Sequence, residues 1–205
     1  MEVLLSVCLG IALSAACGFR IFVPLLIASL AGHFGVIDLT GNWAWLASWP
    51  AIITFMVATL AEITAYYISF LDNLLDTAAF PVATAAGTLL TASQLTEVDP
   101  MLQWTLAAIA GGGAAASMQL ATTKARALSS ATTAGLGNPL LATAEVAGST
   151  FLSGLALFFP ILAAVGAVTL LVVFFVISAV IIKKVVAVFT PAKDPRIIDV
   201  RPDPR

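Results

Sequence analysis

Long apolar runs separated by short polar segments cover most of the chain. A membrane-crossing helix needs about 20 consecutive apolar residues, so runs of this length predict transmembrane helices. The stretch from Val146 to Phe189 is too long for one crossing, and we divide it near residues 164–166. The pattern predicts an all-α bundle of about six transmembrane helices. Their expected spans are 3–31, about 46–70, about 76–93, about 102–123, about 138–164 and about 167–186.

Glycine and proline interrupt several of these runs. The first run is longer than one crossing requires, and Gly18, Arg20 and Pro24 mark the place where we expect it to tilt or break. Pro81 lies inside the third span, and Pro139 suits the first turn of the fifth. Many of the other residues in the third and fourth spans are small, which lets helix backbones approach closely in lipid. We therefore expect a closely packed bundle with some broken helices.

The composition agrees with a membrane protein. Hydrophobic residues make up 60% of the chain and charged residues 10%, whereas soluble domains carry roughly 25% charged residues. We expect a single transmembrane domain over residues 1–190. Residues 191–205, which are rich in proline and basic residues, form a predicted cytoplasmic tail.

The placement of basic residues predicts the orientation. All nine Lys and Arg residues except Arg20 lie beyond residue 123, and the loops 32–45, 94–101 and 164–166 contain none. By the positive-inside rule these loops are non-cytoplasmic and both termini are cytoplasmic. The four tryptophans lie in or next to two of these loops. This placement of basic residues does not fit a nucleic-acid partner.

Charged residues near the apolar runs are the best functional candidates. Such residues are costly in hydrocarbon and usually face the bundle interior, a wet cavity or a partner charge. Projected at 1.5 Å per residue, the acids of spans two, three and five and the bases that end span four converge on the cytoplasmic half of the bundle. The candidates for binding a substrate or ion are Glu62, Glu145, Arg20, Asp76, Asn138 and Arg126.

Two interpretations of this acidic cluster stay open. In a proton- or cation-coupled carrier, Glu62 and Glu145 would take up and release the coupling ion. In the structural interpretation, Glu62 pairs with Arg20 or Arg126, and Glu145 hydrogen-bonds to Ser or Thr hydroxyls. Arg20 itself is either a capping arginine at the helix break or a countercharge within the bundle.

Other polar residues have simpler explanations. Asp72 and Asp76 suit a short loop and a helix start, where aspartate is favoured. Tyr66 and Tyr67 are interpreted as interfacial packing. Cys8 and Cys17 lack companions for a metal site, because His33 is the only histidine. Since the chain also has no HExxH, P-loop or GxGxxG motif, we expect no enzymatic activity, no metal and no cofactor.

The predicted function is a small transporter or channel-like protein for an ion or small solute. The alternative is a non-transporting accessory or assembly subunit of a membrane complex, held by small-residue helix faces. A small bundle often completes its pathway or interface by self-association, so we expect a homo-oligomer or a larger complex in the lipid bilayer. Prolines amid small residues in spans one, three and five leave an internal repeat open.

Three stretches carry a family resemblance: CGFRIFVPLL, DTAAFPVATAAGT and GNPLLATAEVAGS. They resemble an uncharacterised bacterial family of small multi-pass membrane proteins that is known only as a domain of unknown function. The similarity covers roughly residues 5–185. It implies a bacterial multi-pass membrane protein, and it implies no activity, ligand or site residue. We expect the protein to lie in the bacterial inner membrane.

Overall fold

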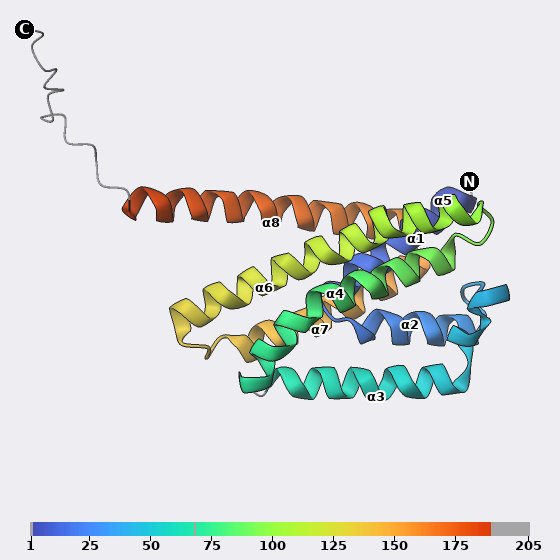
Figure 1. Cartoon of the computed structure of the whole chain (residues 1–205), viewed down its shortest axis with the longest axis horizontal. Coiled ribbons are helices and arrows are strands. Elements are labelled where there is room, and N and C mark those ends of the chain that lie inside the picture. The colour runs from blue at the N-terminus through green and yellow to red at the C-terminus, as the bar shows by residue number, and fades with distance from the viewer. Residues whose placement is uncertain (1, 68, 190–205) are drawn as a thin grey trace, which may run out of the picture. The chain divides into compact units, whose positions relative to one another are not determined.

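The computed structural model describes residues 2–67 and 69–189, with the side chains at 69–74, 76–77, 178 and 181–189 left out (Figure 1). Every regular element in this part of the chain is helical, which confirms the predicted all-α fold. The elements are α1 Glu2–Cys17, α2 Phe22–His33, the 3-10 helix η1 Gly41–Ala47, α3 Trp49–Tyr66, α4 Ser69–Gln94, α5 Pro100–Leu106, the π-helix η2 Ala107–Gly112, α6 Gly113–Thr133, α7 Asn138–Phe158 and α8 Pro160–Phe189.

The chain divides into two compact units, Met1–Leu171 and Val172–Arg205. The first unit contains helices α1 to α7 and the beginning of α8. The second contains the rest of α8. The predicted tail, residues 191–205, lies outside the described residues.

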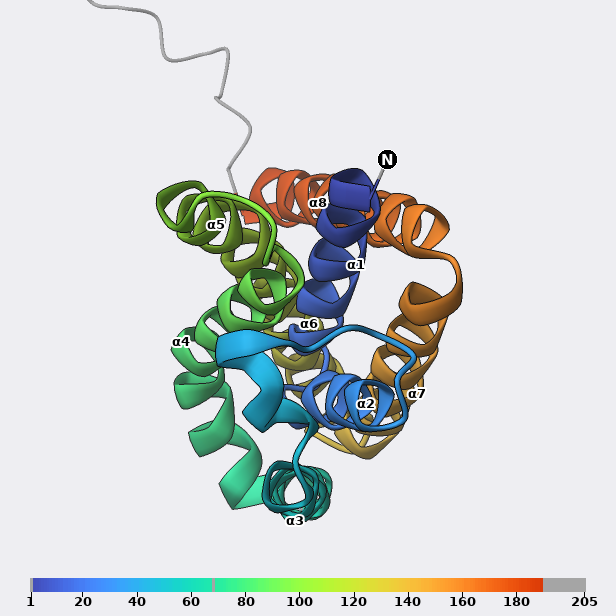
Figure 2. The same cartoon turned by 90° about the vertical axis from the view of Figure 1, so that its right-hand side faces the viewer.

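The first apolar run forms a helical hairpin instead of one crossing. Residues 18–21 end α1 and turn the chain, so that α2 runs back toward the end of the unit at which α1 begins (Figures 1 and 2). Glu2 at the start of α1 and Val36 after α2 line the same cavity. The predicted break is confirmed, but the prediction that residues 3–31 cross the bundle is wrong.

Three described helices are long and apolar enough to cross a membrane: Trp49–Tyr66, Asn138–Phe158 and Pro160–Ile177. This is fewer than the six predicted spans. The predicted first span is split between two shorter apolar helices, α1 and α2. The predicted third and fourth spans are helical, but their alanine, glycine, threonine and polar residues make them less hydrophobic. The residues that allow close packing thus weaken the membrane signal.

The aromatic loops gather at one end of the first unit. The ring centroids of Trp43 in η1 and Trp104 in α5 are 6.0 Å apart, and His33 at the end of α2 lies 4.8 Å from Trp49. The predicted loops around these tryptophans therefore share one side, which we call the tryptophan end. Figure 2 looks onto this end. Tryptophan rings favour the headgroup level of a membrane.

Small residues bring α1, α4 and the η2–α6 segment together. Ser14 on α1 donates a hydrogen bond to the Gly87 carbonyl oxygen on α4 over 2.6 Å, and its hydroxyl lies 2.8 Å from that of Thr91. A Cβ added at Gly111 would lie 2.8 Å from the Gly87 carbonyl oxygen. The interior of this contact is therefore backbone against backbone, as the small-residue pattern predicts.

Gly18 lets the turn of the hairpin touch α6. A Cβ at this position would lie 2.5 Å from the Ala115 carbonyl oxygen and 2.8 Å from the Gln119 backbone nitrogen. We expect Gly18→Ala to lower the free energy of unfolding by about 1–3 kcal/mol, the usual range for overpacking. Thermal unfolding of the purified protein in detergent measures the change.

Gly154→Ala is the matched control for this substitution. Gly154 lies within α7, and no atom of another helix lies within 4 Å of its added Cβ. We expect this variant to be neutral or slightly more stable, because alanine is the better helix former. Equal melting temperatures for the two variants would contradict the close contact between the hairpin and α6.

Candidate functional site

Five buried polar side chains meet where the hairpin turns. Arg20 lies in the turn, and the other four come from α3, α6 and α7. Each is no more than 7% exposed. We call this set the hairpin cluster, and its members are Arg20, Glu62, Tyr66, Arg126 and Glu145.

Glu145 connects two arginines. Arg20 Nη2 lies 3.0 Å from Glu145 Oε2. Arg126 donates from Nε to Glu145 Oε1 over 3.0 Å and from Nη2 to Oε2. Arg20 Nη2 also donates to the Ala142 carbonyl oxygen over 3.2 Å. Charge-assisted bonds of this kind are stronger than neutral ones, and this one carboxylate ties the hairpin turn and α6 to α7.

Tyr66 lies against both arginines. The guanidinium carbons of Arg20 and Arg126 are 3.8 and 4.2 Å from its ring centroid, distances at which a ring attracts a cation. We predicted only interfacial packing for Tyr66, and the structure places it in the cluster instead. Its spacing of four residues from Glu62 puts both on one face of α3. That spacing is the signal by which the sequence could have identified it.

Glu62 caps the start of α2. The backbone N–H groups of Ile21 and Phe22 donate to Glu62 Oε1 and Oε2 over 2.9 and 3.1 Å. Ile21 is the N-cap residue of α2, and its side chain makes no capping bond. A carboxylate from another helix thus satisfies N–H groups that a local Ser, Thr, Asp or Asn usually satisfies. The structural interpretation expected an arginine partner, whereas here both carboxylate oxygens accept from backbone.

Two donors of Arg20 have no partner among the described residues. These donors are Nε and Nη1. The Thr59 hydroxyl, about one turn before Glu62 on α3, also has no hydrogen-bond partner among the described residues. A buried donor without a partner costs roughly 1–3 kcal/mol. Such groups are rare in native structures.

The cluster lies far from the tryptophan end. From Glu2 to Cys17, α1 rises about 24 Å, and Glu145 lies about 10 Å into α7 from its start at Asn138. Four of the six candidate residues thus meet in the half of the first unit that lies away from the tryptophan end. These four are Arg20, Glu62, Arg126 and Glu145.

The other two candidates are Asn138 and Asp76. The Asn138 side chain bonds to α6, where its Nδ2 donates to the Ser130 hydroxyl over 3.0 Å. The side chains of Asp72 and Asp76 lie outside the described residues. Lys124, which we also expected on this side, is exposed.

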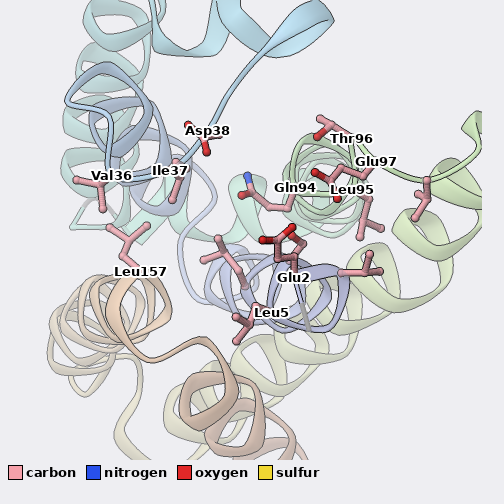
Figure 3. A pocket seen from close by; sticks show the side chains of 14 residues that line it. Glu2, Leu5, Val36, Ile37, Asp38, Gln94, Leu95, Thr96, Glu97 and Leu157 are labelled. Carbon is pink, nitrogen blue, oxygen red and sulfur yellow. The ribbon is translucent and has the colours of Figure 1, made fainter.

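An acid-lined cavity of about 480 Å³ opens at the tryptophan end. Figure 3 shows Glu2, Asp38 and Glu97 around it, which come from the start of α1, the segment after α2 and the segment before α5. No group of three or more His, Cys, Asp or Glu side chains in the described residues is placed to hold a metal ion. Carboxylates at this end raise the local concentration of cations and protons.

A second cavity, of about 220 Å³, adjoins the hairpin turn. Ile21 and Phe22, whose N–H groups Glu62 caps, form part of its lining. The rest of the lining is apolar and comes from α2, η1, α3 and α4. These residues are Leu25, Trp45, Leu46, Phe55, Val82, Ala85, Ala86, Leu89 and Leu90.

Comparison with known proteins identifies a family and no activity. No curated protein and no solved structure shows significant similarity to the chain. A family model described as a domain of unknown function, DUF4126, matches residues 7–179. The match includes the turn of the hairpin and all five cluster residues. The chain therefore belongs to the DUF4126 family, which confirms the predicted membership of an uncharacterised family.

Proposed function

We propose that the protein is a small membrane transporter or channel-like protein that moves an ion or small solute through the region of the hairpin cluster. The observation that carries the proposal is the interruption of a helix beside buried charges. Irregular backbone at membrane depth is tolerated only where protein buries it or a cavity adjoins it. Interrupted helices whose ends face charged groups are characteristic of transport sites.

The cost of the cluster supports this proposal. It buries two guanidinium groups and two carboxylates, and desolvation of buried ion pairs can exceed the attraction between the charges. Apolar residues of similar volume often give equal or greater stability. A purely structural purpose is therefore a weak explanation for four buried ionisable side chains. Such residues in membrane segments more often serve ion or substrate pathways.

We also propose an orientation in the bacterial inner membrane, with the tryptophan end outside. The loops 32–45 and 94–101 at this end lack Lys and Arg, whereas α6 carries Lys124 and Arg126 toward its opposite end. Because Glu2 also lies at the tryptophan end, this orientation places the start of the chain outside. The predicted cytoplasmic N-terminus is not compatible with it. Self-association in the bilayer stays a prediction.

Flux through reconstituted liposomes tests the proposal. The full chain is assayed for movement of protons, potassium, chloride and small organic acids. We expect Glu62→Gln to lower the flux of the transported species by about tenfold, equivalent to about 1.4 kcal/mol in the barrier. Thr64→Val is the control, because Thr64 lies on the exposed face of the same helix, and it should leave the flux unchanged.

Two results would contradict the proposal. Equal flux in the wild type and Glu62→Gln would remove the cluster from the pathway. No flux of any tested species through correctly folded protein would favour the accessory-subunit alternative. Purification of an unrelated membrane complex with the protein in a fixed ratio would strengthen that alternative.

A further inference from the structure

We infer that the apolar cavity beside the hairpin turn holds one acyl chain of a membrane lipid, which enters from the leaflet at the tryptophan end. The cavity is built by α2 with the residue before it, η1, α3 and α4, and we call it the α2–α4 cavity. The inference goes beyond the proposed transport function, because lipid can bind here whether or not the protein moves a solute.

The lining of the α2–α4 cavity identifies the ligand as hydrocarbon. The cavity has a volume of about 220 Å³, and the indole nitrogen of Trp45 is the one polar side-chain atom among the described residues that line it. Apolar walls stabilise hydrocarbon, whereas a polar group taken from water would lose its hydrogen bonds there. An apolar cavity of about 150 Å³ holds a benzene ring, so part of an acyl chain fits into this one.

The α2–α4 cavity opens toward the outside of the bundle. Trp45 of η1 and Val82 and Leu89 of α4 line it and are exposed, whereas Leu25 of α2 and Ala86 of α4 are buried at its floor. The wall on α3 belongs to a helix that is long and apolar enough to cross a membrane. The medium that meets the opening is therefore the hydrocarbon of the bilayer.

The opening is continuous with the apolar outer surface of α3. Phe55 lines the cavity, and its neighbours Ile53, Met56 and Val57 are exposed. On the other side, α4 packs mainly against α1, η2 and α6 and contacts α2 and α3 only sparsely. An acyl chain can thus enter from the lipid beside α3, and it would supply the dispersion contacts that α4 does not make with α2 and α3.

The cavity is nearly as long as one leaflet is thick. Its lining on α4 extends from Val82 to Leu90, eight residues or about 12 Å. On α2 it begins at Phe22, and Leu46 lies beside Ser29, which donates to the Leu46 carbonyl oxygen. Ser29 follows Phe22 by seven residues, or about 10 Å. Half of a hydrocarbon core of about 30 Å is about 15 Å, so one leaflet supplies a chain of the required length.

The tryptophan end is the side from which the lipid enters. In Figure 2, η1 lies between α2 and α4 at this end. The ring of Trp45 in η1 lies 6.5 Å from that of Phe55 between centroids, and tryptophan favours the headgroup level. At the other end of the cavity are Ile21 and Phe22. The methyl end of the acyl chain would therefore contact the residues that begin α2.

Photo-crosslinking in nanodiscs tests the cavity. One copy of the full chain is held per nanodisc in phosphatidylcholine with a diazirine midway along one acyl chain, and mass spectrometry identifies the labelled residues. Val57 is the lipid-facing reference for Leu25, because each lies eight residues from the contact between His33 and Trp49. Val57 is 60% exposed and Leu25 6%, so labelling by exposure alone would give Leu25 one tenth of the yield. We expect Leu25 to be labelled as strongly as Val57.

Two substitutions separate the cavity from the surrounding lipid. Ala86→Phe fills part of the cavity and should lower the yield at Leu25 at least about tenfold, which corresponds to lost burial of roughly two methylene groups. The yield at Val57 should stay unchanged, which also shows that the variant is folded in the membrane. Ala147→Phe on the exposed face of α7 is the matched control and should change neither yield. If Ala86→Phe does not fold, Ala85→Phe replaces it with the same expectation.

Three results would overturn the inference. The first is labelling of Leu25 at one tenth of Val57, or labelling of Leu25 that Ala86→Phe leaves unchanged. The second comes from a lipid whose diazirine lies next to the headgroup: it should label Leu46 in preference to Leu25, and the opposite preference would exclude entry from the tryptophan end. The third is loss of the Leu25 label in nanodiscs that hold two copies, which would assign the cavity to a second copy of the chain.

Discussion

Glu145→Gln is expected to lower the free energy of unfolding by about 3–5 kcal/mol, the range for removing one partner of a buried ion pair. The substitution leaves Arg20 and Arg126 buried without the carboxylate that they share. A carboxamide has one carbonyl oxygen and no charge, so it cannot replace both contacts. Thermal or denaturant unfolding of the purified protein measures the loss.

Two further variants show whether charge is the cause. Glu97→Gln makes the same chemical change on an exposed side chain and should have little effect on stability. The double variant Glu145→Leu with Arg126→Met removes one charge of each sign, so it does not change the net charge. It should be more stable than Glu145→Gln alone. If the double variant were less stable than Glu145→Gln, packing around Glu145 would matter more for stability than its charge.

Impermeant thiol labelling should place the start of α1 and the segment before α3 on the same side of the membrane. Val3 is exposed and lines the acid-lined cavity, and Gly41 begins η1. Cysteines at Val3 and Gly41 should therefore both react from outside. A cysteine at Gly135, between α6 and α7, should react only from the cytoplasmic side.

The labelling needs a background without competing thiols. Cys8 is replaced by alanine, whereas Cys17 is fully buried and can stay. If residues 3–31 crossed the membrane once, Val3 and Gly41 would react from opposite sides. That result would contradict the hairpin, and reaction of both only from the cytoplasmic side would reverse the proposed orientation.

The hydrophobic pattern predicted the helices better than their directions. Glycine at position 18 and the buried charge of Arg20 marked the break correctly, because both disfavour a continuous lipid-facing helix. No feature of the sequence indicated that α2 runs back along α1. Residues 12–17 of α1 are buried on every side, so the run stays apolar whether the next helix continues or reverses. Whether α2 continues α1 or reverses its direction depends here on tertiary contacts, such as that of Gly18 with α6.

The charged side chains of the candidate site could be predicted from the sequence, whereas the backbone N–H groups that contribute to it could not. Arg20, Glu62, Arg126 and Glu145 were identified because ionisable side chains are rare in this chain. The capping role of Glu62 depends on N–H groups 40 and 41 residues earlier, and backbone groups have no sequence signature. Asn138, at the start of α7, bonds to Ser130 of α6.

The contact of Arg20 with α7 also bears on the order in which the protein matures. Its acceptor, the Ala142 carbonyl oxygen, lies 122 residues later in the chain. At synthesis rates of about 5–20 residues per second, it leaves the ribosome on the order of ten seconds after Arg20. Through that interval the newly made hairpin has a guanidinium group without a countercharge from α7. We expect it to wait at the aqueous surface and to enter the bundle only after α7 has been made.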